Sequence, residues 1–191
     1  LRKGCGAMNR ELLHSLKEDK HSEYLLEQTI KDAQQGRMSM PEQVGSLDID
    51  NIVLARRFSR EQGVKSNGEK KIRAVDDMSA NHVNASAQAT GKNKNDGIDA
   101  LVRAAVLMGV AMKRAPAFWK ADIDSAFRRI PIRTRDKWAS WVAFLHKGTA
   151  YAAQHQALMF GSLGSVHGWD SVGALLCHLG QRLLHLGLFR Y

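Results

Sequence analysis

The sequence predicts an α+β fold, and three observations support that class. Two extended segments flank Asn67-Gly68, a pair of residues typical of the tight turn of a β-hairpin. Two further segments flank Lys147-Gly148 and predict a second hairpin. Apolar residues at helical spacing precede, separate and follow these hairpins. With 191 residues, 44% hydrophobic and 25% charged, the chain can bury a core of ordinary composition.

The first part of the chain predicts helix and then strand. Apolar side chains recur at helical spacing over residues 8–37, with a charged interruption near residues 17–21. We expect this part to be a packing or spacer segment. Residues 52–55 then predict a strand, and residues 70–77 predict the strand that returns after Asn67-Gly68.

The middle of the chain predicts a buried helix that leads into a buried strand. Residues 98–112 are mostly apolar, with Asp96 as the expected N-cap. The apolar run 117–119 predicts the strand, which would present Asp122 at its end. Pro131 predicts extended chain around it because proline fixes φ and disfavours helix at the preceding residue.

The last part predicts the second hairpin and a long helix. Residues 138–145 and 150–158 supply the two strands. The segment that begins at Met159 opens an apolar helix expected to run to about Leu186.

Charge is unevenly distributed along this basic chain, whose net charge is +9. Residues 1–60 carry ten basic and nine acidic side chains, whereas residues 61–191 carry eighteen and ten. Such an excess is what a polyanion-binding surface requires.

Composition also limits the class of protein. No apolar run reaches the roughly 18 residues that span a bilayer, so we expect no membrane partner. Residues 1–4 are not followed by an apolar signal core, which favours an intracellular piece of a longer protein. Cys5 and Cys177 lie far apart and suggest a reducing compartment rather than a disulfide.

Asp122 is the most informative acidic residue. A carboxylate at the end of a buried strand costs several kcal/mol to desolvate unless a cation or metal neutralises it. Capping of the next turn is the plainer alternative. Asp124 would share the same strand face, so geometry alone does not choose between the two.

Asp122, with Ala126 and Phe127 after it and then Ile-Pro-Ile, resembles the first catalytic motif of the reverse transcriptase palm. The family's spacing selects Asp122 over Asp124. The resemblance implies that Asp122 is a catalytic ligand of two Mg²⁺ ions and that the Ile123 peptide oxygen is a further ligand. It also implies that Phe127 packs under the incoming sugar and disfavours a 2′-hydroxyl.

Arg73, Val75 and Asp77, with Asn84 after them, resemble the fingers hairpin of the same family. The resemblance implies that Arg73 holds the triphosphate of the incoming nucleotide, for which a guanidinium is well suited. Three lysines qualify as its helper: Lys65, Lys70 and Lys71.

Phe160 and Gly161, followed by Ser165, resemble the second palm motif, which contacts the base and lets backbone approach the nucleotide. Met159 stands where the family often has proline. Tyr191 resembles the tyrosine of the third motif, so the chain resembles a fragment that ends there, without the pair of aspartates that follows in the family.

The resemblance implies an incomplete right-hand polymerase fold: reverse transcriptase fingers and a partial palm after an N-terminal helical segment. The expected ranges are 1–48 for the helical segment and 49–191 for the rest, with fingers at about 49–85 and 133–158 and palm at about 86–132 and 159–191.

The function implied is that of a retrotransposon-type RNA-directed DNA polymerase, a nucleotidyltransferase. It would use Mg²⁺, an RNA or DNA template with a primer, and deoxynucleoside triphosphates. Because Asp122 is one carboxylate, the chain alone is expected to be inactive. Two alternatives stay open: a non-catalytic nucleic-acid-binding remnant of such a polymerase, and a helical interaction protein whose basic face binds acidic partners.

Overall fold

The computed structural model confirms a mixed α+β fold and describes residues 2–64, 66–88, 96–120, 122–184 and 187. The chain forms two compact units. The first comprises Leu1–Gln88 and Phe127–Val166, and the second comprises Ala89–Ala126 and His167–Tyr191. The predicted boundaries of helical segment, fingers and palm stay predictions.

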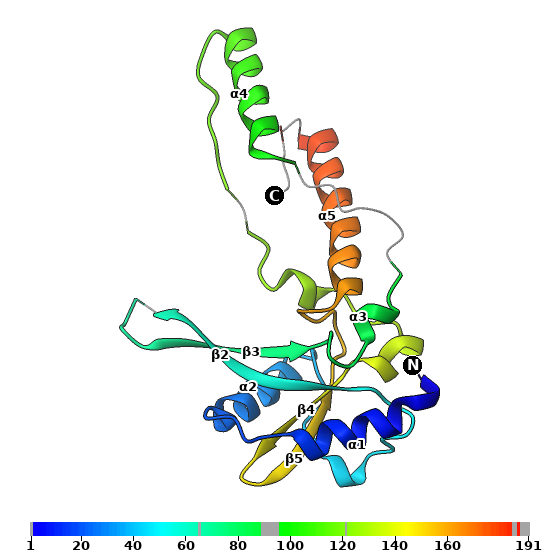
Figure 1. The fold of residues 1–191 in the computed structure, drawn as a ribbon. Helices are drawn as coiled ribbons and strands as arrows, with labels where there is room; N and C mark the ends of the chain where they lie inside the picture. The colour runs from blue at the N-terminus through cyan, green and yellow to red at the C-terminus, as the bar shows by residue number, and fades with distance from the viewer. Residues whose placement is uncertain (1, 65, 89–95, 121, 185–186, 188–191) are drawn as a thin grey trace. The chain divides into compact units, whose positions relative to one another are not determined.

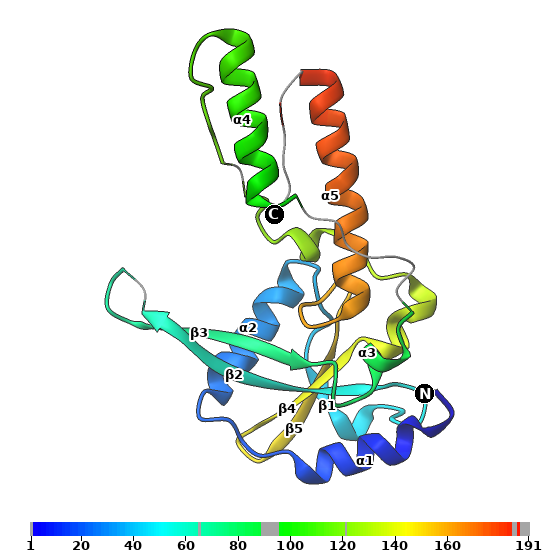
Figure 2. The same cartoon turned by 45° about the horizontal axis from the view of Figure 1, so that its top comes forward.

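A five-stranded mixed sheet forms the centre of the first unit, in the order β1-β5-β4-β2-β3. The strands are β1 (Glu42–Gln43), β2 (Leu54–Val64), β3 (Lys70–Asp77), β4 (Trp141–His146) and β5 (Thr149–Gln154). Both predicted hairpins are confirmed, β2 with β3 and β4 with β5, while β2 and β4 run parallel. The β2–β3 hairpin projects beyond the rest of the sheet (Figures 1 and 2).

The turns of both hairpins use the residues that the sequence indicates. Gly68 has φ +83°, and Lys147 and Gly148 have φ +50° and +74°. In the second turn, positive φ at both central residues gives a twist that matches that of the strands it joins. The second turn is held further by Glu18, whose carboxylate accepts from the backbone N–H groups of Lys147 and Gly148.

The N-terminal helices pack on the sheet. The predicted helical region contains α1 (Cys5–Ser15) and α2 (Ser22–Gln34), interrupted where the charged residues lie. The α2 helix lies against β2 and β4, and α1 lies against β2. Asn9 fixes α1 by donating to the carbonyls of Ile49 and Ile52 and accepting from the Leu54 N–H. The segment therefore belongs to the same packed unit as the sheet.

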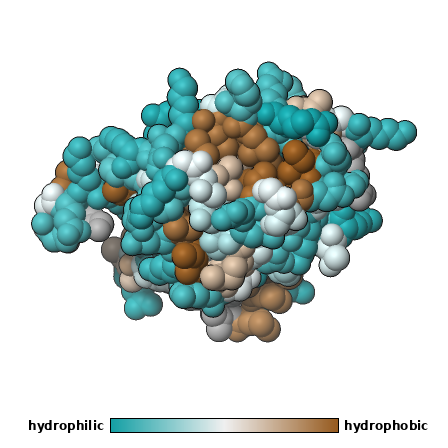
Figure 3. All heavy atoms as spheres, turned by 90° about the horizontal axis from the view of Figure 1, so that it is seen from below, coloured by the Kyte–Doolittle hydropathy of each residue, from teal (hydrophilic) through white to brown (hydrophobic). Residues whose placement is uncertain are grey.

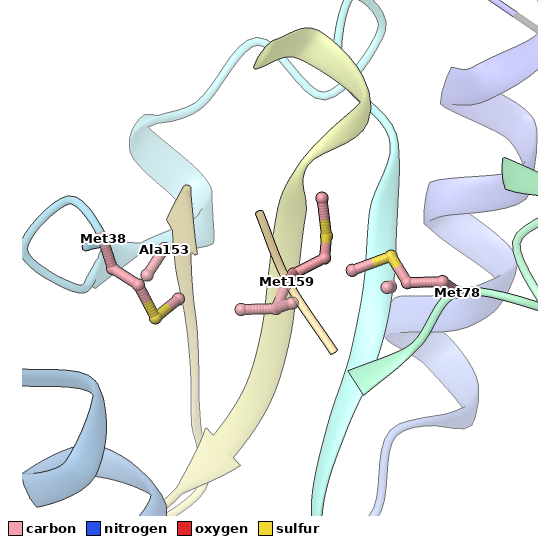
Figure 4. Close-up of a cluster of buried hydrophobic side chains, with 6 residues drawn as sticks. Met38, Met78, Ala153 and Met159 are labelled. Atoms are coloured by element: carbon pink, nitrogen blue, oxygen red, sulfur yellow. The ribbon is translucent and has the colours of Figure 1, made fainter. Parts of the chain in front are cut away.

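Two apolar clusters fill opposite faces of the sheet because side chains alternate along a strand. One is rich in methionine and joins strand residues to the segments that follow β3 and β5; its members are Met38, Ala55, Met78, Val142, Ala153 and Met159 (Figure 4). The other contains Leu16, Val44, Leu54, Ala143 and Ala152, with partly buried apolar residues around it. Seen from below, hydrophobic atoms remain visible among hydrophilic ones (Figure 3).

The shorter helices of the first unit are the 3₁₀ helices η1 (Arg2–Gly4), η2 (Val44–Ser46) and η4 (Thr134–Ala139), and the single-turn α3 (Val83–Ser86). A further 3₁₀ helix, η3 (Ala126–Arg129), begins at the boundary between the units. The predicted extended chain around Pro131 is confirmed: the Ile132 N–H donates to the Gln156 carbonyl, and Pro131 bridges Ala157.

The second unit contains α4 (Ile98–Met112) and most of α5 (Leu163–Leu184). Both helices were predicted, but the burial of α4 was wrong, since none of its residues is buried. Gly97, not Asp96, is its N-cap, and no side chain caps it. No helix among the described residues is long and apolar enough to cross a membrane.

The predicted strand at residues 117–119 is wrong. These residues are irregular, and Phe118 and Trp119 are 66% and 62% exposed. A strand needs a neighbour that satisfies its backbone N–H and C=O groups, and no described residue pairs with this segment. Asp122 therefore does not lie at the end of a buried strand, and it is exposed.

Candidate nucleotide-binding surface

An aromatic pair brings two of the predicted motifs together in the first unit. The rings of Phe127 and Phe160 meet edge to face, with centroids 5.1 Å apart. The cause is local pairing of the chain, in which the Leu158 N–H donates to the Ile130 carbonyl at 2.8 Å. Phe127 lies three residues before this link and Phe160 two residues after it, so the pairing aligns the two rings.

Asn84 joins the end of the fingers motif to the second palm motif. Its Nδ2 donates to the Gly161 carbonyl at 2.8 Å, and its Oδ1 accepts from the Leu163 N–H at 2.8 Å. The latter bond satisfies one of the free N–H groups at the start of α5. Asn84 therefore holds the loop that carries Phe160 and Gly161.

Gly161 is required by the backbone at this point. Its φ is +84°, and a Cβ there would lie 2.9 Å from the Asp76 carbonyl oxygen. Both features exclude an ordinary side chain. The close neighbour at Gly161 is thus the backbone of β3, and the approach of the Gly161 backbone to a nucleotide stays a prediction.

Arg73 and Asp77 lie on β3, each two residues from Val75, so the three side chains share one strand face. Arg73 is exposed, and the Asp77 carboxylate accepts from the backbone N–H groups of Ser79 and Ala80. Asp77 thus fixes the turn after β3. Its role in nucleotide binding stays a prediction.

Sequence reasoning missed three residues on the face that Arg73 occupies. The β2–β3 register places Arg60 opposite Arg73 and Phe58 opposite Val75. The guanidinium carbons of Arg56 and Arg60 lie 5.8 and 5.3 Å from the centroid of the Phe58 ring. The alternation of Arg56, Phe58 and Arg60 was the signal, because alternate residues share a strand face.

The described residues do not fit a complete Mg²⁺ site. Asp122 and Ile123 are exposed on irregular chain in the second unit. Within the described ranges, no group of three or more His, Cys, Asp or Glu side chains could hold a metal ion. The grouping of Asp122 with Arg73, and the ligand roles of Asp122 and Ile123, stay predictions. Tyr191 and Lys65 lie outside the described residues.

Comparison with known proteins finds a similarity in fold and none in sequence. No family model and no curated protein matches the sequence. Two solved structures of foamy virus protease-reverse transcriptase match at 16% identity, each over 91% of this chain. The native enzyme from prototype foamy virus gives a TM-score of 0.52, and a foamy viral enzyme in complex with an RNA/DNA hybrid gives 0.53. The chain spans about a fifth of the length of those chains, and its fold is similar to that of a reverse transcriptase.

Proposed function

We propose that this chain forms the surface of an RNA-directed DNA polymerase that receives the incoming nucleotide. The observation that carries the proposal is the meeting of separate motifs in one unit: the Phe127–Phe160 pair, and the loop at Gly161 held by Asn84. The likeness in fold to reverse transcriptases supports the same class of activity. The retrotransposon subclass belongs to the proposal.

The face of the β2–β3 hairpin that carries Arg56, Arg60 and Arg73 would hold the triphosphate. Arg60 and Arg73 lie directly opposite each other across the strands, although like charges in this position destabilise a sheet. A bound polyphosphate relieves that repulsion and accepts charge-assisted hydrogen bonds from both guanidinium groups. Lys70 is engaged with Glu61 at 3.0 Å, so of the two predicted helpers that the structure describes, Lys71 is the better placed.

The aromatic pair would select the sugar. Phe160 is 58% exposed and supports the partly buried ring of Phe127 from its edge. A ring fixed in this way leaves no freedom to move aside for a 2′-hydroxyl. Phe127→Ala is expected to raise the affinity of a ribonucleotide relative to the matching deoxynucleotide.

Catalysis would need a complete Mg²⁺ site, and the described residues do not bring together enough ligands for one. Two Mg²⁺ ions need several carboxylate oxygens, and Asp122 supplies one carboxylate. Joining the chain to a palm segment that carries the third motif should restore extension of a primer, and Asp122→Ala should abolish it. Undiminished extension by that variant would reject the role of Asp122.

Nucleotide binding tests the proposal on the chain itself. We expect the chain to bind a fluorescent deoxynucleoside triphosphate in the presence of an RNA/DNA primer-template, with affinity measured by anisotropy. Arg73→Ala should lower that affinity about ten- to hundredfold, because each hydrogen bond to a charged group is worth about 1.5–3 kcal/mol. Arg135→Ala removes the same charge from a side chain that is 76% exposed and serves as the control. Equal losses in the two variants would contradict the assignment.

A second candidate function is a nucleic-acid-binding remnant without catalysis. The exposure of Asp122 on irregular chain favours it. The same experiment separates the two candidates: a remnant binds the primer-template but shows no binding of the triphosphate that depends on Arg73.

A further inference from the structure

A buried ionic cluster lies in the first unit, and none of its members was predicted as a site residue. It joins five segments that are distant in sequence: α2, β2, β3, η3 and the residue after β5. Its members are Asp32, Arg57, Asp76, Arg128 and His155, each with a side chain at most 9% exposed.

One side of the ionic cluster links the sheet to α2. Arg57 Nη1 donates to both carboxylate oxygens of Asp76, at 3.0 and 3.2 Å. Arg57 Nη2 lies 3.8 Å from Asp32 Oδ2. Because removal of one partner leaves a buried charge uncompensated, these groups hold each other in place.

The other side passes through Arg128. Its Nη2 donates to Asp32 Oδ2 at 2.5 Å, and its Nη1 lies 2.6 Å from His155 Nδ1. A guanidinium only donates, so His155 Nδ1 must accept and the proton resides on Nε2. That Nε2 donates to Asp76 Oδ2 at 3.0 Å, which closes the cluster into a ring of five side chains.

Arg128 directly follows Phe127 in η3, which spans only Ala126–Arg129. A 3₁₀ helix of one turn has little stability of its own, so external contacts must fix its direction. The side chain of Arg128 points into the ionic cluster, while Phe127 meets Phe160. The orientation of the Phe127 ring is therefore tied to the two bonds of the Arg128 guanidinium.

We propose that Arg128 is a positioning residue: through its bonds to Asp32 and His155 it holds Phe127 against Phe160. The helix α2 thereby contributes to the placement of an aromatic ring almost a hundred residues away in sequence. The consequence for sugar selection rests on the proposed function, whereas the positioning itself does not.

The test measures the contact between the two rings in the chain as it exists. NMR spectra of the chain with labelled phenylalanine should show a nuclear Overhauser effect between the rings, assigned with Phe127→Leu and Phe160→Leu. Arg128→Gln should abolish this effect while hydrogen exchange of the β4–β5 amides stays protected. Arg129→Gln, a neighbouring and exposed arginine, is the matched control and should retain it. An unchanged effect in Arg128→Gln would overturn the proposal.

Two further measurements test the proposal if Arg128→Gln fails to fold: the variant Arg128→Lys, and the pH dependence of the nuclear Overhauser effect in the wild-type chain. Arg128→Lys keeps the charge but replaces the rigid fork of two nitrogens with a single nitrogen on a flexible stem, so the effect should weaken and not vanish. In the wild-type chain, acidification that protonates His155 would set two donors 2.6 Å apart. The charged groups that face His155 are Arg128, Asp76 and Arg57, with Asp32 beyond them. The effect should disappear together with the change in the His155 ring signals; its persistence would overturn the proposal.

The consequence for sugar selection has a separate readout. If the proposed function holds, Arg128→Gln should shift the preference between deoxyribonucleotide and ribonucleotide in the same direction as Phe127→Ala. Loss of the ring contact without any nucleotide binding by the wild-type chain would reject the proposed function and leave the positioning role intact.

Discussion

At the scale of single residues, Gly161 combines two constraints that can be separated by experiment. Its positive φ disfavours any side chain, and a Cβ would also meet the Asp76 carbonyl. Gly161→Ala should lower the free energy of unfolding by roughly 1–3 kcal/mol, measured by urea denaturation. Gly36 has φ +70° with open space around it, so Gly36→Ala carries the conformational cost alone. Equal losses in the two variants would show that the close approach costs nothing.

The two hydrogen bonds by which Asn84 holds the loop at Gly161 can also be separated by substitution. Asn84→Asp keeps the oxygen that accepts from the Leu163 N–H but loses the donor to the Gly161 carbonyl. We expect a loss of about 0.5–1.5 kcal/mol in unfolding free energy, the usual net worth of one hydrogen bond, because this bond is exposed and water can reach the Gly161 carbonyl. Hydrogen exchange at Leu163 should stay slow in Asn84→Asp and become fast in Asn84→Ala. Fast exchange in both variants would contradict this division of roles.

At the scale of elements, α4 shows that apolar composition alone does not establish burial. Val106 and Leu107 are 59% and 71% exposed, although the sequence predicts a buried helix. Val106→Lys should change the free energy of unfolding by no more than about 0.5 kcal/mol, since nothing is removed from a core. Val142→Lys makes the same exchange at a fully buried position and should unfold the first unit. A large loss in Val106→Lys would mean that α4 is covered in solution.

In the β2–β3 hairpin, sequence and structure agree on the returning strand and differ on the outgoing one. The predicted returning strand 70–77 coincides with β3, whereas the outgoing strand was predicted at residues 52–55 and β2 runs from Leu54 to Val64. Its ladder is irregular between Glu61 and Val64, where Gly63 has φ +68°, and a glycine within a strand is a recognised signal of such a bulge.

At the scale of the whole first unit, the ionic cluster makes stability depend on pH. Burial by itself raises the pKa of the Asp76 carboxyl, but Arg57 and His155 outweigh it and lower that pKa from 3.8 to about 2. A lowered pKa stabilises the folded state above pH 3.8, and that stability disappears as pH falls from 3.8 towards 2. The expected loss is about 2 kcal/mol, measured by denaturation at a series of pH values. Asp136→Asn, at an exposed carboxylate, should leave the profile unchanged.

His155 makes the stability of the fold depend on pH in a second, higher range. Burial lowers the pKa of its imidazole, and the attraction of Asp76 only partly opposes this. The unfolded chain therefore takes up a proton near pH 6.5 before the folded chain does, so stability declines as pH falls below 6.5. Replacement of His155 by Gln should remove this slope and keep the one below pH 3.8. A slope that survives the replacement would assign it to another group.

The net charge of the whole molecule predicts how nucleic-acid binding depends on salt. With a net charge of +9, binding of an RNA/DNA hybrid should weaken steeply and log-linearly with added salt. Titrations at several salt concentrations give the slope, which should become shallower in Arg73→Ala. A slope near zero would exclude the phosphate backbone as the main contact.

By itself, the sequence determined the α+β class, the hairpin turns, the helices and the extended chain at Pro131, because residue type and local period control these features. It also grouped Asp122, Arg73, Phe127 and Phe160, of which the structure brings Phe127 and Phe160 into contact. Only the tertiary structure decided that Asp76, rather than Asp77, is buried among opposite charges, and that Asp122 is exposed. Burial and charge pairing depend on which distant segments meet, and no local pattern records the pairing of Asp32 with Arg128 across the sequence.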